Sequence, residues 1–137
     1  MSLAFFDTNI LIYADDTSAA TKQAKADGLF REHFERGTAL LSLQVLQEYY
    51  SAVTRKLGTD PQAAQRRVEI LASSNVVRFQ ARDVIAAIEF HRLTQVSFWD
   101  AMIVHAARIG GASVLYSEDL QHGAIMGGVK VLNPFRT

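Results

Sequence analysis

The chain has 137 residues, enough for one compact domain with a proper core, and we expect residues 1–137 to form a single domain. It has no cysteine, which excludes disulfides and thiolate-held zinc sites, and its 14 Lys and Arg balance its 14 Asp and Glu, so bulk charge does not indicate a nucleic-acid-binding protein. No apolar run approaches the ~20 residues that a membrane span needs, and the N-terminus lacks a signal-like pattern, so we expect a cytoplasmic protein.

Five short apolar runs predict β-strands. They occupy residues 3–6, 39–41, 76–79, 113–116 and 129–132. The first, second and fourth runs are almost wholly apolar and do not alternate with polar residues, which is typical of strands buried on both faces.

Helical patterns lie between these strands. They cover residues 19–36, 43–57, 60 to about 72, 83–93 and 98–109. Gly37 suits a helix C-terminus, and Asp60 followed by Pro61 suits a helix N-terminus. Strands separated by helices imply right-handed crossovers and a mostly parallel sheet. The predicted fold class is therefore α/β, a three-layer α/β/α sandwich.

Acidic residues follow two of the predicted strands. Asp7 interrupts the apolar run FFDTNILIY directly after the first strand, and Ser117, Glu118 and Asp119 directly follow the fourth. Open parallel sheets bind ligands outside the carboxyl ends of their strands, so these acids emerge where a site is expected. Asp is also common in strand-to-helix loops because its side chain accepts from nearby backbone N–H groups, and each residue alone leaves that alternative open.

Two further acids lie on predicted helices. Glu48 falls roughly 60° outside the apolar arc of its helix, where position alone favours a solvated flank or a local pair with a cation. Asp100 lies three residues after Ser97, which matches a helix-capping box. Capping does not exclude a functional role, because a helix N-terminus can face a cleft.

A cluster of these four carboxylates requires a cation. Packed acids repel one another, and the pKa of at least one rises unless a cation neutralises them. Oxygen-only ligands favour Mg²⁺ or Mn²⁺, which activates water and stabilises charge on a phosphoryl group, so the cluster indicates phosphodiester hydrolysis. The histidines are scattered and offer no better site: His33, His91, His105 and His122.

Two pairs of basic residues are candidates for a basic rim that contacts a nucleic-acid backbone. They are Arg55-Lys56 and Arg66-Arg67. Charge pairs on helices are more often simply solvated, and that alternative stays open.

Four motifs, FFDTNILIY, LQVLQEYY, FWDAMIVHAA and VLYSEDL, together resemble the PIN domain, and most closely the bacterial toxin ribonucleases of the VapC type. The resemblance runs from Phe5 to about Pro134 in order and spacing. It implies a PIN-like fold and a catalytic set made of one acid from each motif: Asp7, Glu48, Asp100 and Asp119.

The resemblance also implies a role for each of these positions. Asp7, Asp100 and Asp119 hold the metal, while Glu48 completes the site and helps to orient the attacking water. The supporting residues are Asn9, which matches a polar residue that orders the first acid, and Ser117, which stands where the family often has Thr. Glu118 is an extra acid in the same turn, although Asp119 fits the family spacing better.

The implied activity is that of an endoribonuclease that uses Mg²⁺ or Mn²⁺ and a water nucleophile to hydrolyse RNA. The resemblance further implies a homodimer and an antitoxin protein that blocks the site, often with a C-terminal segment carrying a basic residue. Two alternatives stay open. A phosphoaspartyl-type phosphatase is disfavoured because it normally needs a second Asp where this chain has Asn9, and the other alternative is a degenerate, non-catalytic PIN domain used for binding.

Overall fold

A computed structural model describes residues 2–136, and its centre is a six-stranded sheet with the order β3-β2-β1-β4-β6-β5. The strands are β1 Leu3–Phe6, β2 Ala39–Ser42, β3 Asn75–Val77, β4 Ala112–Tyr116, β5 Ile125–Met126 and β6 Val129–Leu132. Every neighbouring pair is parallel except β5 and β6, which are antiparallel. The predicted mostly parallel sheet is confirmed.

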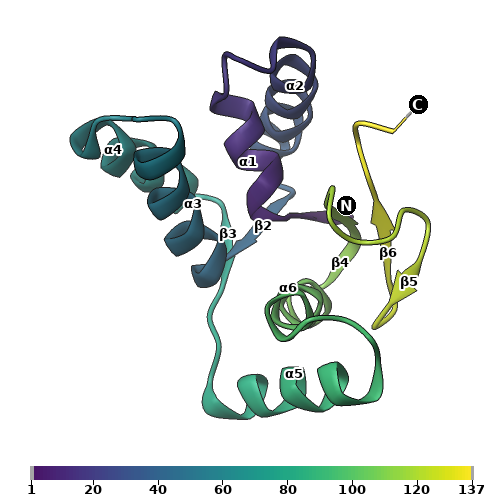
Figure 1. Ribbon diagram of the computed structural model, residues 1–137. Helices are drawn as coiled ribbons and strands as arrows, with labels where there is room; N and C mark the ends of the chain where they lie inside the picture. Colours follow the sequence, from purple (N-terminus) through teal and green to yellow (C-terminus); the bar gives the residue numbers. More distant parts are fainter. Residues whose placement is uncertain (1, 137) are drawn as a thin grey trace.

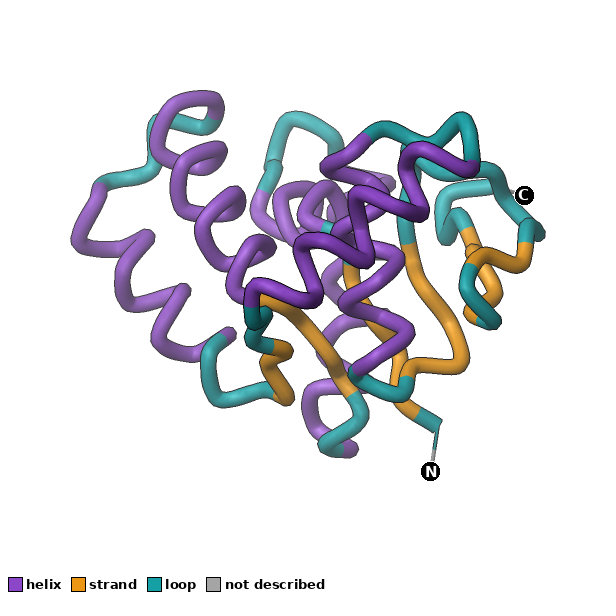
Figure 2. The backbone as a smooth tube through the Cα atoms, turned by 90° about the horizontal axis from the view of Figure 1, so that it is seen from below, coloured by secondary structure: helices purple, strands orange, loops and turns teal. Residues whose placement is uncertain are grey.

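Helices cover both faces of this sheet. They are α1 Thr8–Asp15, α2 Ala20–Arg36, α3 Leu43–Lys56, α4 Pro61–Leu71, α5 Ala81–Leu93 and α6 Phe98–Ile109. In Figure 1, α1 and α2 lie on one side of the strands and α6 lies on the other, with α5 outside it. Figure 2, seen from below, shows helices in front of and behind the strands, as in the predicted α/β class. Within residues 2–136 no helix is both long and apolar enough to cross a membrane.

Strand β1 lies inside the sheet, between β2 and β4. Phe5 pairs with Leu40 on one side and Leu115 on the other, and Phe5 and Leu115 are fully buried, as the continuous apolar runs predict. Because β1 and β4 are parallel, their carboxyl ends meet at one edge. The backbone N–H of Asp7 donates to the Tyr116 carbonyl at 2.9 Å, so the two predicted acidic segments are adjacent.

Some elements differ from the prediction. The predicted set lacks helix α1, whose residues continue the apolar run after Asp7, and also lacks β5, which is only two residues long. Strand β3 ends at Val77 rather than at residue 79, because its partner β2 ends at Ser42 where α3 begins, and Ser42–Val77 is the last pair. Helix α5 begins at Ala81, two residues earlier than predicted, behind a capping box of Gln80 and Asp83.

Helix α3 is oriented by a polar contact with α1 and α4. The Tyr49 hydroxyl donates to one oxygen of Asp15 at the end of α1, and Arg67 of α4 lies 3.6 Å from the other oxygen. Burial and the neighbouring Asp15 carboxylate raise the pKa of Tyr49, so the phenol stays protonated as the donor. Glu48, the residue before Tyr49, also contacts α1, because the Thr8 hydroxyl donates to its carboxylate.

Candidate active site

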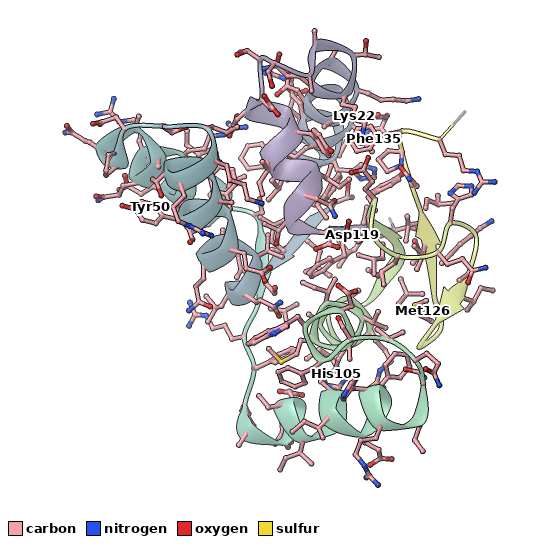
Figure 3. All side chains as sticks on the ribbon, in the orientation of Figure 1. Lys22, Tyr50, His105, Asp119, Met126 and Phe135 are labelled. Atoms are coloured by element: carbon pink, nitrogen blue, oxygen red, sulfur yellow. The ribbon has the colours of Figure 1, made fainter. Side chains whose placement is uncertain are left out.

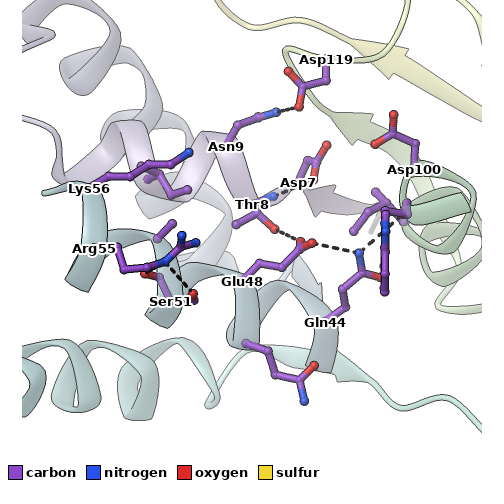
Figure 4. Close-up of a pocket in the computed structure, with 15 residues that line it drawn as sticks. Asp7, Thr8, Asn9, Gln44, Glu48, Ser51, Arg55, Lys56, Asp100 and Asp119 are labelled. Carbon is purple, nitrogen blue, oxygen red and sulfur yellow. Dashed lines mark hydrogen bonds between the residues drawn. The ribbon is translucent and has the colours of Figure 1, made fainter. Parts of the chain in front are cut away.

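A cleft of about 490 Å³ lies at the carboxyl edge of the sheet, and all four predicted acids line it (Figure 4). They come from four separate segments: Asp7 precedes α1, Glu48 lies on α3, Asp100 lies in the first turn of α6, and Asp119 follows β4. The structure therefore brings together residues that are as much as 112 positions apart in the chain.

Asp7 is the most buried of the four, with 6% of its surface exposed. Its Oδ1 accepts the Thr8 N–H at 2.7 Å, as the N-cap of α1, and its Oδ2 accepts the Ser117 hydroxyl at 2.8 Å. Burial, followed by the charges of Asp100 and Asp119, raises the pKa of Asp7 to about 6 against the lowering effect of these two hydrogen bonds. The carboxyl is thus held rigidly where its ionised form is disfavoured.

Glu48 lines the cleft. The interpretation favoured by its position on the helix alone, a side chain on a solvated flank, is therefore wrong. Its Oε1 accepts the Thr8 hydroxyl at 2.7 Å, and its Oε2 accepts the Gln44 side-chain amide at 3.3 Å. Thr8 therefore connects two of the acids, because its backbone N–H binds Asp7 and its hydroxyl binds Glu48.

Asp100 combines the capping position with a place in the cleft. Its backbone N–H donates to the Ser97 hydroxyl at 3.1 Å, which begins α6, while its side chain lines the cleft. Burial raises the pKa of Asp100, and the charges of Asp119 and Glu48 raise it further, against the lowering contribution of Ser97. The acids are close enough to influence one another's protonation.

Asp119 is the exposed member of the set, and Asn9 holds it. The Asn9 side-chain amide donates to Asp119 Oδ2 at 3.0 Å, and the Asn9 carbonyl oxygen accepts the Glu118 N–H at 3.4 Å. We expected Asn9 to order Asp7, but it positions the turn after β4 instead. Buried Ser117 connects that turn to Asp7, because its hydroxyl donates to Asp7 and accepts the Asp119 N–H at 3.2 Å.

Glu118 lies outside the cleft, in a contact with the other end of α1. It accepts the Tyr13 hydroxyl at 2.9 Å and pairs with the Lys22 ammonium at 2.5 Å. Lys22 also lies over the rings of Tyr13 and Phe135. Figure 3 shows Lys22 beside Phe135. This geometry gives Glu118 a role in fixing the turn and leaves Asp119 as the acid that faces the cleft.

Sequence reasoning missed several polar and aromatic residues that line the cleft. They are Thr8, Gln44, Gln47, Ser51 and Trp99. Three of these adjoin predicted acids, Thr8 after Asp7, Gln47 before Glu48 and Trp99 before Asp100, and that adjacency was the available signal. Of the two basic pairs, Arg55-Lys56 lines the cleft, whereas Arg66-Arg67 does not.

The donor chemistry of the cleft fits a hard divalent cation. Four carboxylates line the cleft, and among the residues that the structure describes its lining includes no His or Cys. A bound cation would offset the charges that raise the pKa values of Asp7 and Asp100. Within residues 2–136, no three acidic or imidazole side chains are arranged as a ready-made metal cage. Mg²⁺ usually binds through one or two carboxylates and keeps several waters, so an open arrangement of this kind suits it.

The chain belongs to the PIN domain family, which it matches over residues 4–125. Its fold is similar to that of Mycobacterium tuberculosis VapC20, a toxin that cleaves the sarcin–ricin loop, with a TM-score of 0.65 and 21% identity over 85% of this chain and 89% of that one. It is also similar to a chain of a toxin–antitoxin complex from Klebsiella pneumoniae, with a TM-score of 0.69 and 18% identity over 98% of this chain and 99% of that one. No curated protein matches the chain.

Proposed function

We propose that this PIN domain is a divalent-metal-dependent endoribonuclease that hydrolyses RNA phosphodiester bonds, and that it is the toxin of a type II toxin–antitoxin pair. One observation carries the proposal: carboxylates from four separate segments of a PIN domain line a single cleft. The raised pKa values of Asp7 and Asp100 support it, because a site built for a cation keeps acids together at a cost to the apo protein.

Each acid has a proposed role. Asp7, Asp100 and Asp119 are the residues that would hold Mg²⁺ or Mn²⁺, an ion that activates water and stabilises charge on a phosphoryl group when bound. Glu48 accepts a hydrogen bond from the attacking water and so orients it, and Thr8 fixes the Glu48 carboxylate for this role. Ser117 and Asn9 are positioning residues, Ser117 for Asp7 and Asn9 for Asp119.

The proposal extends to assembly and partners. Residues 1–137 act as a single nuclease domain in the cytoplasm, as a homodimer, and a cognate antitoxin blocks the cleft. The similarity of the fold to a chain of the Klebsiella toxin–antitoxin complex supports this partnership. Inspection of the adjacent upstream reading frame for a small DNA-binding protein would test it.

Cleavage of RNA with Mg²⁺ or Mn²⁺, compared with EDTA and with the Asp7→Asn variant, tests the activity. We expect cleavage only with metal and only with Asp7. Cleavage that persists in EDTA, or is unchanged in the variant, would contradict the proposal. Absence of divalent-ion binding in calorimetry would favour the non-catalytic alternative, whereas a beryllofluoride adduct at Asp7 would favour the phosphatase.

A further inference from the structure

The cleft follows helix α3 and has chemically different ends. Gln44, in the first turn of α3, donates to the Trp99 carbonyl at 3.5 Å, which places Trp99 at this end. Arg55 and Lys56, in the last turn, line the other end. Gln44 and Arg55 are eleven positions apart on the helix, a rise of about 16 Å at ~1.5 Å per residue.

Trp99 presents a large aromatic side chain to solvent at the cleft. Its surface is 60% exposed, and its indole meets the Phe98 ring edge-on, with the centroids 5.0 Å apart. An exposed Trp beside a carboxylate of the cleft offers a π-face to a ligand, and nucleic-acid bases of every kind stack on such faces.

Arg55 and Lys56 are cations without an acidic partner, although the four acids line the same cleft. Among residues 2–136, neither makes an ion pair, whereas Arg31, Arg36 and Arg67 each pair with a carboxylate. Arg55 Nε donates to the carbonyl and hydroxyl of Ser51, both at 3.2 Å, which leaves the terminal nitrogens available. In Figure 4 both cations lie across the cleft from Asp100.

We infer that a single-stranded nucleic acid lies along α3, with a base stacked on Trp99 and a backbone phosphate bound by Arg55 and Lys56. A stacked strand advances about 3.4 Å per nucleotide, so about 16 Å accommodates four to five nucleotides. Glu48 lies on α3 between the two contacts, so the strand between them passes the acids. The choice of RNA as the strand rests on the proposed function.

The stacking contact is testable without catalysis, because Trp99 is the sole tryptophan of the chain. A short single-stranded oligoribonucleotide added in EDTA should quench the tryptophan fluorescence saturably. A fluorescein-labelled copy, followed by anisotropy in EDTA, then compares the affinities of the variants. We expect Trp99→Leu to weaken binding roughly tenfold or more, and Trp99→Phe, which keeps an aromatic face, to weaken it less.

The phosphate contact is testable by salt dependence. The slope of log K against log salt should fall by about 0.7 for each single-strand phosphate contact that is lost, so we expect Lys56→Gln and Arg55→Gln to flatten it. Lys25→Gln and Arg66→Gln are matched controls, since both residues are exposed and lie outside the cleft. These controls should bind with the parent slope.

The outcomes separate this inference from the proposed nuclease activity. If Trp99→Leu binds the oligoribonucleotide with the affinity of the parent protein, or if the salt slope is unchanged in both cation variants, the inferred path of the strand along α3 is wrong, even if metal-dependent cleavage is intact. Trp99→Leu that loses affinity only for a protein partner, and not for RNA, would also overturn it. If the oligoribonucleotide quenches the fluorescence and the variants lose affinity and salt slope as expected, the path along α3 is supported even if no cleavage is found. Only the nuclease proposal would then fail.

Discussion

Asp7 shows at the scale of one residue how a functional group opposes stability. Its pKa of about 6 lies above the ordinary 3.8, so the folded state binds the proton more tightly than the unfolded state does. Protonated Asp7 therefore contributes to the free energy of unfolding, and this contribution is fully present below about pH 4 and is lost as pH rises through about 6. Two pKa units correspond to roughly 3 kcal/mol, an upper bound on what ionised Asp7 costs at neutral pH.

We therefore expect Asp7→Asn to abolish cleavage and to raise the free energy of unfolding at pH 7 by about 1–3 kcal/mol in EDTA. Asn removes the buried charge and still caps a helix well, so the Thr8 N–H keeps its acceptor. Chemical denaturation at several pH values measures this gain, which should decline from pH 7 toward pH 4. A gain of equal size at pH 4 would assign the effect to something other than the charge.

The two acids of the turn after β4 have separable roles. We expect Asp119→Asn to lower metal-dependent kcat/KM by roughly 10- to 100-fold, whereas Glu118→Gln, whose parent side chain binds Lys22 and Tyr13, should change it little. Initial cleavage rates over a metal titration measure both variants. The reverse ranking would make Glu118 the functional acid and contradict the site described here.

At the scale of elements, α6 approaches the sheet closely through Gly110. A Cβ added there would lie 2.5 Å from Leu40 Cδ2 and 2.8 Å from Val77 Cγ2, so side chains of β2 and β3 would have to move. We expect Gly110→Ala to lower the free energy of unfolding by about 1–3 kcal/mol, as overpacking does.

Gly28 is the matched control for this substitution. It lies inside α2 with no atom near an added Cβ, so Gly28→Ala should stabilise the protein by about 0.5–1 kcal/mol through helix propensity. Urea denaturation of both variants measures the difference. Equal effects at the two positions would mean that contact at Gly110 does not limit packing.

The elements also show how far sequence reasoning reaches. Apolar runs without alternation identified buried strands, and their parallel order predicted that Asp7 and Asp119 meet at one edge. The helix after Asp7 escaped prediction because its apolar residues simply extend the strand-like run. Helical periodicity favoured a solvated flank for Glu48, and only the resemblance to PIN domains named it in the catalytic set. In the structure the Thr8 hydroxyl, a contact that periodicity does not reveal, binds its carboxylate at the cleft.

At the scale of the whole molecule, the mutual repulsion of the acids links metal binding to global stability. A ligand that binds only the folded state stabilises it by about 2.7 kcal/mol at 100 times its Kd. We expect saturating Mg²⁺ or Mn²⁺ to raise the Tm by several degrees and Asp7→Asn to reduce this shift. Thermal melts with metal and with EDTA measure it, and a Tm indifferent to both ions would contradict a metal site in the cleft.

The position of β1 inside the sheet has a consequence for biosynthesis. Strand β1 can pair with β2 once synthesis has passed Ser42, but its other neighbour, β4, begins only at Ala112. The hydrogen bonds from Ser117 to Asp7 and from Asn9 to Asp119 each span 110 residues, so neither can form on a shorter nascent chain. The cleft is thus completed only after the chain has been made through Asp119, and a nascent chain shorter than that lacks the full set of acids that the proposed nuclease needs.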